Sequence, residues 1–117
     1  MDLGKTIRKW VSILRLRDWT IRYRYVHPDE IDGSDGRVYV DLKTKTADIK
    51  VSDDTSRGPM HFRGRDIEAD VVHELMHLHL ETFFPADRDS LAYTMAEQAT
   101  DEIAKAFIAL DRRKPRG

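Results

Sequence analysis

Apolar and polar positions repeat with two different periods along the first half of the chain. Over residues 5–16 the apolar side chains recur every three or four positions, which predicts an amphipathic helix with basic residues over much of its polar face. Residues 19–26, 37–42 and 47–51 alternate with a period of two, which is typical of half-buried strands. The Asp/Gly-rich stretch 32–36 predicts a turn between the first two strands.

The second half of the chain predicts a loop followed by two helices. Residues 52–64 are rich in Asp, Ser, Gly and Pro and indicate a loop. Over residues 65–84 the apolar positions cover more than one stripe, which indicates a substantially buried helix that Pro85 ends. A last helix, capped by Asp87 or Asp89, continues to about Arg112. Its apolar residues recur at helical spacing: Leu91, Met95, Ala99, Ile103, Ala106 and Leu110.

These elements predict one α+β domain over residues 1–112. It has an N-terminal helix, a three-stranded and mostly antiparallel sheet, and two C-terminal helices. The antiparallel meander is favoured because three consecutive strands are joined by short connections. The basic end, residues 113–117, is expected to be disordered and solvated.

The composition limits which residues could bind a metal, but it does not identify a binding partner. The chain has 117 residues, a formal charge of −1 and no cysteine, so a metal would have to be bound by His, Asp or Glu. It begins with no secretory signal and has no apolar run long enough to span a membrane, which favours a cytoplasmic protein without a membrane partner. The basic face of the first helix could contact nucleic acid, although solvated charge on an exposed helix is the commoner case.

The helix over residues 65–84 contains the motif H-E-L-M-H. His73 and His77 are four residues apart, so both imidazoles project from one helical face and can bind a single cation. Glu74 lies beside them, where its carboxylate can take a proton from a water molecule. The alternative is a chance occurrence of five letters in an ordinary helix, so the motif predicts a metal site only if a third ligand exists.

The last helix offers that ligand in the string E-Q-A-T-D. Glu97 and Asp101 are four residues apart and share a helical face, so Glu97 could bind the metal while Asp101 orients the ring of His73. Two acids on a solvated face are the alternative. Glu81 also competes as third ligand, but it shares a helix with both histidines. His79 points about 200° around that helix from His77 and is expected to be packed or hydrogen-bonded.

The H-E-L-M-H string at 73–77, followed by E-Q-A-T-D at 97–101, resembles the gluzincin metallopeptidases. The order of elements is similar to that of the minimal members called minigluzincins, and to the zincin-like domains of phage and mobile-element regulators. In outline the resemblance covers nearly the whole chain, but its specific motifs span only residues 73–101. A metzincin-like extension fits worse, because Leu80 and Phe83 stand where that pattern needs Gly and His.

The resemblance implies Zn²⁺ on His73, His77 and Glu97, with Glu74 as general base in the hydrolysis of a peptide or protein substrate. From the residues themselves, Tyr93, one turn before Glu97, or His61 in the loop could stabilise the developing oxyanion. The alternatives are a Tyr93 that closes the edge of the core and a His61 that is a plain surface histidine. An exposed strand within residues 37–51 would hold the substrate extended, and loop arginines could select an acidic group: Arg57, Arg63 and Arg65.

The resemblance also leaves two other hypotheses open. In one, the domain is a regulatory or DNA-associated module that binds zinc with little or no proteolytic activity. In the other, the site is closed by its own loop or tail. The downstream domain that completes the cleft in larger family members is missing from this stretch of sequence, so the cleft is expected to be shallow.

Overall fold

The computed structural model describes residues 2–53 and 65–113. The predicted helices and strands are present, with ends that differ by a few residues from those expected. Most of the predicted loop, and residues 114–117 of the predicted tail, lie outside the described residues. The elements are α1 (Leu3–Ile13), β1 (Thr20–Val26), the 3₁₀ helix η1 (Pro28–Ile31), β2 (Gly36–Asp41), β3 (Thr46–Ser52), α3 (Ile67–Leu80), the 3₁₀ helix η2 (Glu81–Phe83) and α4 (Leu91–Arg112).

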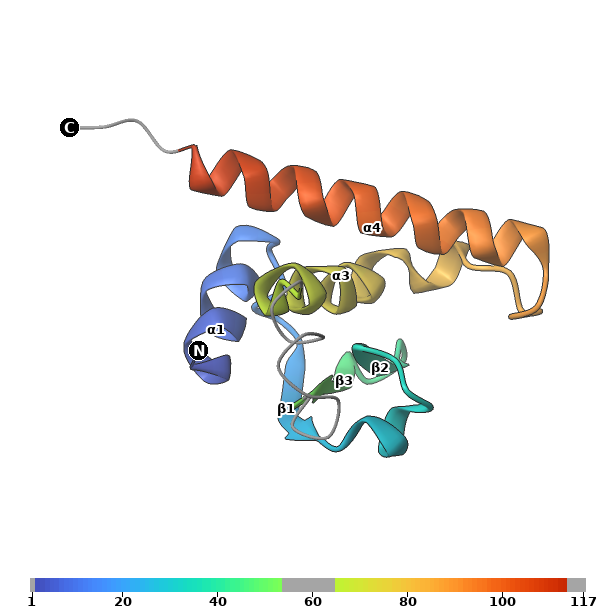
Figure 1. Ribbon diagram of the computed structural model, residues 1–117, viewed down its shortest axis with the longest axis horizontal. Helices are drawn as coiled ribbons and strands as arrows, with labels where there is room; N and C mark the ends of the chain where they lie inside the picture. The colour runs from blue at the N-terminus through green and yellow to red at the C-terminus, as the bar shows by residue number, and fades with distance from the viewer. Residues whose placement is uncertain (1, 54–64, 114–117) are drawn as a thin grey trace.

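The helices are stacked on one side of the sheet. Figure 1 shows α3 lying between the sheet and α4, with α1 beside α3 and the sheet. The central place of α3 explains why its apolar residues do not form a narrow stripe, because it packs against a partner on several sides. The expectation of a substantially buried helix is confirmed. Its buried side chains join Trp10 of α1 and the strand residues Ile49 and Val51 in the core, and they include Val71, Val72, Leu75 and Leu78.

The sheet is mixed, so the prediction of a mostly antiparallel meander was wrong. The strand order is β1-β3-β2, with β3 parallel to β1 and antiparallel to β2. The connection from β1 to β2 includes η1, whose Ile31 is fully buried. This connection leaves room for one strand between β1 and β2. The slot beside β1 is then filled by β3, whose Ala47, Ile49 and Val51 are all buried.

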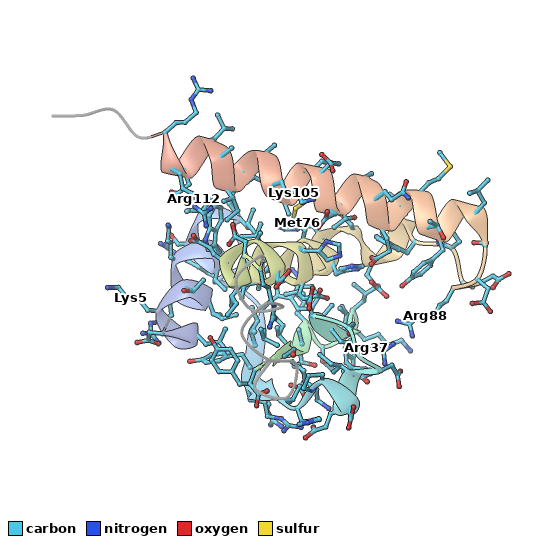
Figure 2. The ribbon with its side chains drawn as sticks, viewed as in Figure 1. Lys5, Arg37, Met76, Arg88, Lys105 and Arg112 are labelled. Atoms are coloured by element: carbon cyan, nitrogen blue, oxygen red, sulfur yellow. The ribbon has the colours of Figure 1, made fainter. Side chains whose placement is uncertain are left out.

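A partly buried carboxylate joins α1, α3 and α4 at the end of the helical layer opposite the α3–α4 connection. Glu68 of α3 accepts hydrogen bonds from Trp10 Nε1 at 2.7 Å, Lys9 Nζ at 3.2 Å and Arg112 Nη2 at 3.1 Å. Arg112 also donates to the neighbouring Asp66, and its position on α4 is labelled in Figure 2. These contacts join the start of α3 to the end of α4.

The carboxylates of this cluster are expected to make the fold acid-sensitive. Burial alone would raise the pKa of Glu68, but hydrogen bonds from Trp10, Arg112 and Lys9 outweigh it, and the hydrogen bonds from Arg112 lower the pKa of Asp66. A lowered pKa in the folded state means that the stabilisation is complete above the unfolded value, near 4, and is lost as pH falls through the folded value. We expect Glu68→Gln to lower the melting temperature by about 5 °C at pH 7, and by less at pH 3. Thermal unfolding followed by circular dichroism measures both values, and an equal loss at the two pH values would contradict the assignment.

None of the helices in the described part of the chain is long and apolar enough to cross a membrane.

Candidate metal centre

Three of the predicted ligands come together where α4 crosses α3. His73 and His77 are on successive turns of α3, and Glu97 reaches them from α4. Glu97 Oε2 is 3.4 Å from His73 Nε2, and Glu97 Oε1 is 2.7 Å from His77 Nε2. One ligand atom from each residue lies within 4.8 Å of the others, and this is the group of potential metal ligands found among the described residues. The choice of Glu97 over Glu81 as third ligand, made from the sequence, agrees with this arrangement.

The spacing of these atoms fits a small divalent cation. Ligand atoms at about 2.0–2.1 Å from a tetrahedral zinc lie about 3.3 Å apart, close to the distance between His73 Nε2 and Glu97 Oε2. Glu97 Oε1 is buried, and although His77 Nε2 is close to it, no donor among the described residues meets it in hydrogen-bonding geometry. Native proteins rarely leave a buried carboxylate oxygen in that state, and a bound ion can account for such an oxygen. The residues present therefore fit a metal.

The charges at the centre also favour a cation. The adjacent imidazoles of His73 and His77 lower the pKa of Glu97 to about 2, so this carboxylate stays ionised. Burial alone would lower the pKa of both imidazoles, but the adjacent carboxylate of Glu97 and the charge of Glu74 outweigh it, and both pKa values are raised. The raised pKa values mean that protons compete with a metal for these nitrogens, so metal binding here would release protons and weaken as pH falls.

The ring nitrogens that face away from the cluster also have carboxylate partners. His73 Nδ1 lies 3.5 Å from Asp101 Oδ1, as predicted, and Lys105 holds the other oxygen of Asp101 at 2.8 Å. His77 Nδ1 lies 3.1 Å from Glu81 Oε2. Such contacts fix the ring orientation and leave Nε2 free to bind a metal. From the sequence, Glu81 was only a competing ligand, although its i, i+4 spacing from His77 was the signal for this orienting contact.

Glu74 is buried beside the cluster, against the sheet. This residue is 8% exposed, and burial raises the pKa of its carboxyl to about 7. Gly36, at the start of β2, lies so close that a β-carbon there would be 3.3 Å from both Cγ and Oε2 of Glu74. A glycine at this position therefore lets the edge strand reach the acid. From the sequence, Gly36 belonged only to a turn, and its approach to Glu74 was missed.

The cluster opens into a cleft of about 410 Å³ between β2, α3 and the start of α4. Tyr93 was predicted to face the site, and the structure places it in the cleft wall with its ring 5.2 Å from that of Phe84. Phe84 in turn stacks on His77 at 4.6 Å. Arg37 and Arg88, both labelled in Figure 2, also line the cleft. The rest of the lining includes Gly36, Val38, Glu74, His77 and Glu97.

The segment that could hold a substrate by strand pairing is shorter than the sequence predicted. In the part of the chain that the structure describes, β2 pairs only with β3, so the other edge of β2 is open beside the cleft. Because β3 is the central strand, with a neighbour on each side, it offers no edge. The expected range 37–51 therefore reduces to β2.

The other residues considered from the sequence lie away from the cluster or outside the described residues. Arg65 has a side chain that is only 4% exposed and donates to Asp70, to the carbonyl of Ser52 and to the carbonyl of Asp35, so its predicted contact with substrate was wrong. His79 is exposed, and its Nε2 lies 2.7 Å from the carbonyl oxygen of Leu14, so of the two expected roles it has the hydrogen-bonded one. Three predicted residues lie outside the described residues: Arg57, His61 and Arg63.

No protein-family model, curated protein or solved structure matches the chain. The metal centre therefore depends on the geometry of the chain's own residues. The resemblance to the minimal gluzincins stays a prediction from the two motifs.

Proposed function

We propose that this protein is a zinc-dependent peptidase. The observation that carries the proposal is the position of Glu74, buried beside the cluster of His73, His77 and Glu97 and lining the same open cleft. A metal site with only structural importance is normally closed by four protein ligands, whereas three ligands beside a cleft leave a position for substrate or water. Two imidazoles and one carboxylate, with no thiolate, favour zinc among the common cations.

The site has the parts that amide hydrolysis needs. A zinc ion bound there would polarise the scissile carbonyl and lower the pKa of a water molecule toward neutrality. The carboxylate of Glu74 would take the proton from that water and pass it to the leaving amine. Burial raises the pKa of Glu74 to about 7 in the metal-free site, and a bound cation would favour the ionised carboxylate, which is the form that takes the proton.

Two further parts of the chain would position the substrate. The open edge of β2 can pair with an extended peptide, and this pairing would direct one peptide bond of the substrate toward Glu74. The phenol of Tyr93 would donate a hydrogen bond to the oxygen that becomes negatively charged in the transition state. His61 stays a second candidate for that donor from the sequence alone.

A peptide library tests this function directly. We expect the purified protein to bind one zinc ion per chain and to cleave members of a mixed peptide library, with the products identified by mass spectrometry. Cleavage should stop when a chelator removes the metal and return when zinc is added back. Zinc binding at full stoichiometry with no cleaved peptide would overturn the peptidase proposal.

That outcome would favour the second candidate, a module that binds zinc without proteolysis and contacts nucleic acid. One observation supports it. On the sheet face turned away from the helices, Arg24, Lys50 and Arg37 are cross-strand neighbours, and Tyr39 lies beside them with Lys50 Nζ 5.3 Å from its ring centre. Adjacent cations with an aromatic ring are typical of surfaces that bind phosphate and bases. Both arginines also have acidic partners on or next to η1, so we rank this function second.

A further inference from the structure

The outer face of α4 is apolar along its whole length. Its large side chains are well exposed: Leu91 is 74% exposed, Leu110 63%, Met95 59% and Ile103 44%. Ala99 and Ala106, which are also exposed, continue the same line. These six residues are the set whose spacing predicted the helix, and we call them the outer stripe.

The outer stripe is not the face that packs on α3. The buried residues of α4 are Thr100, Ala104 and Ile108, and Glu97 projects from the same side toward the metal centre. At 100° per residue, the outer stripe is centred about 155° around the helix from that buried face. Figure 1 shows α4 as the outermost layer of the described fold, with no described element over its outer side. Exposed apolar patches of this extent mark interaction surfaces.

The two ends of the outer stripe are complementary to each other. Consider a two-fold axis on the stripe side of α4, perpendicular to the helix and level with the midpoint between residues 100 and 101. It pairs the residues near the two ends of the stripe with apolar or small residues of an antiparallel copy. It pairs the residues near the middle with longer side chains that have polar ends. A two-fold dimer needs such self-complementarity, because residue i of one copy meets residue j of the other and the reverse. A different protein partner would impose no such symmetry. The matched positions are Leu91 with Leu110, Met95 with Ala106, Ala99 with Glu102, and Ile103 with Gln98.

We propose that α4 pairs with α4 of a second copy in an antiparallel two-fold dimer. The polar neighbours of the stripe agree with this occupant. The same axis sets the amide of Gln98 beside Glu102 of the other copy. The positive and negative ends of the two helix dipoles also lie side by side. The proposal does not depend on the metal centre, because Glu97 lies on the opposite side of α4.

The size of the surface predicts a weak dimer. From Leu91 to Leu110 the outer stripe is about 28 Å long. A helix pair in contact over that length would bury on the order of 1,000 Å², at the lower bound for a specific interface. We therefore expect a dissociation constant in the micromolar range, with the dimer visible by analytical ultracentrifugation at roughly 100 μM.

One pair of variants tests which surface makes the dimer. Met95→Glu puts a charge into the centre of each half of the stripe and is expected to weaken dimerisation by about 100-fold or more. Phe83→Glu is the matched control, because Phe83 is 76% exposed but lies in η2, outside the stripe, and it should leave the dissociation constant unchanged. A wild-type protein that sediments as a monomer up to about 500 μM would overturn the proposal, as would a dimer that Met95→Glu leaves intact.

The absence of native cysteine allows a second test, of helix direction. In the antiparallel pair the two copies of Ala99 are close to the axis, with Cα atoms about 5–7 Å apart, so Ala99→Cys is expected to form a disulfide-linked dimer on oxidation. Leu91→Cys alone should not, because its two copies would be about 28 Å apart. Mixing Leu91→Cys with Leu110→Cys should give the linked heterodimer. Efficient self-linking of Leu91→Cys would indicate a parallel pair and overturn the two-fold arrangement.

Discussion

Glu74→Gln is expected to lower the rate constant of peptide hydrolysis by about 10²- to 10⁴-fold, while zinc binding stays at one ion per chain. Glutamine has the shape of a glutamic acid but cannot accept and return a proton, so the substitution removes the acid–base step alone. The fold should tolerate the change. Burial already raises the pKa of Glu74 to about 7, so much of this side chain is uncharged at neutral pH before any metal binds.

A surface variant of the same chemistry provides the control. Glu30→Gln also replaces a carboxylate by an amide, but Glu30 lies on η1 and contacts only Arg24 in the described structure, so activity should match the wild type. The comparison needs three measurements on each variant: zinc content, urea unfolding, and initial rates on a peptide from the library. If Glu74→Gln kept the wild-type rate with zinc bound, another group would have to move the proton.

The cluster of potential metal ligands was predictable because local helix geometry determines most of it. His77 follows His73 by four positions, as Asp101 follows Glu97, and any α-helix turns such pairs to one face whatever the rest of the fold does. Only one thing was left to tertiary structure, namely that the two faces meet. Arg112, the last residue of α4, donates a hydrogen bond to Glu68 at the other end of the same two helices. The periodicity of the sequence does not predict this contact.

The sheet topology was not predictable by the same reasoning. Alternation located the strands, but it says nothing about which strand lies in the middle, and the rule that consecutive strands pair favoured a meander. The order β1-β3-β2 depends on the burial of Ile31 in the connection between β1 and β2. The contact of Gly36 with Glu74 follows from that order, because β2 becomes the edge strand next to α3.

Periodicity also cannot tell which of two apolar faces packs. In α4 one face carries the outer stripe. The other face, from which Glu97 projects, carries the buried residues Thr100, Ala104 and Ile108. The larger side chains belong to the outer stripe, so the stronger signal in the sequence came from the face that the structure leaves exposed. The helix was predicted correctly from residues that do not hold it in place.

Glu97→Ala is expected to weaken zinc binding by on the order of 10³-fold, more than the 10- to 100-fold that loss of an outer partner costs. The substitution leaves two imidazoles on one helix, so the ion would lose the only carboxylate among its three proposed ligands. Competition with a chromophoric zinc chelator measures the affinity. Because the side chain of Glu97 is 38% exposed and borders the cleft, truncation should leave the fold intact, which circular dichroism can check.

Two neighbouring carboxylates give the scale for that loss. Asp101→Asn and Glu81→Gln each remove a partner of the ring nitrogen that faces away from the ion, so each should weaken zinc binding by about 10- to 100-fold. The expected ranking, with Glu97 well ahead of both, separates a ligand from an orienting contact. If Glu81→Gln instead caused the larger loss and Glu97→Ala a small one, the third ligand would come from the helix of the histidines, and α4 would only cover the site.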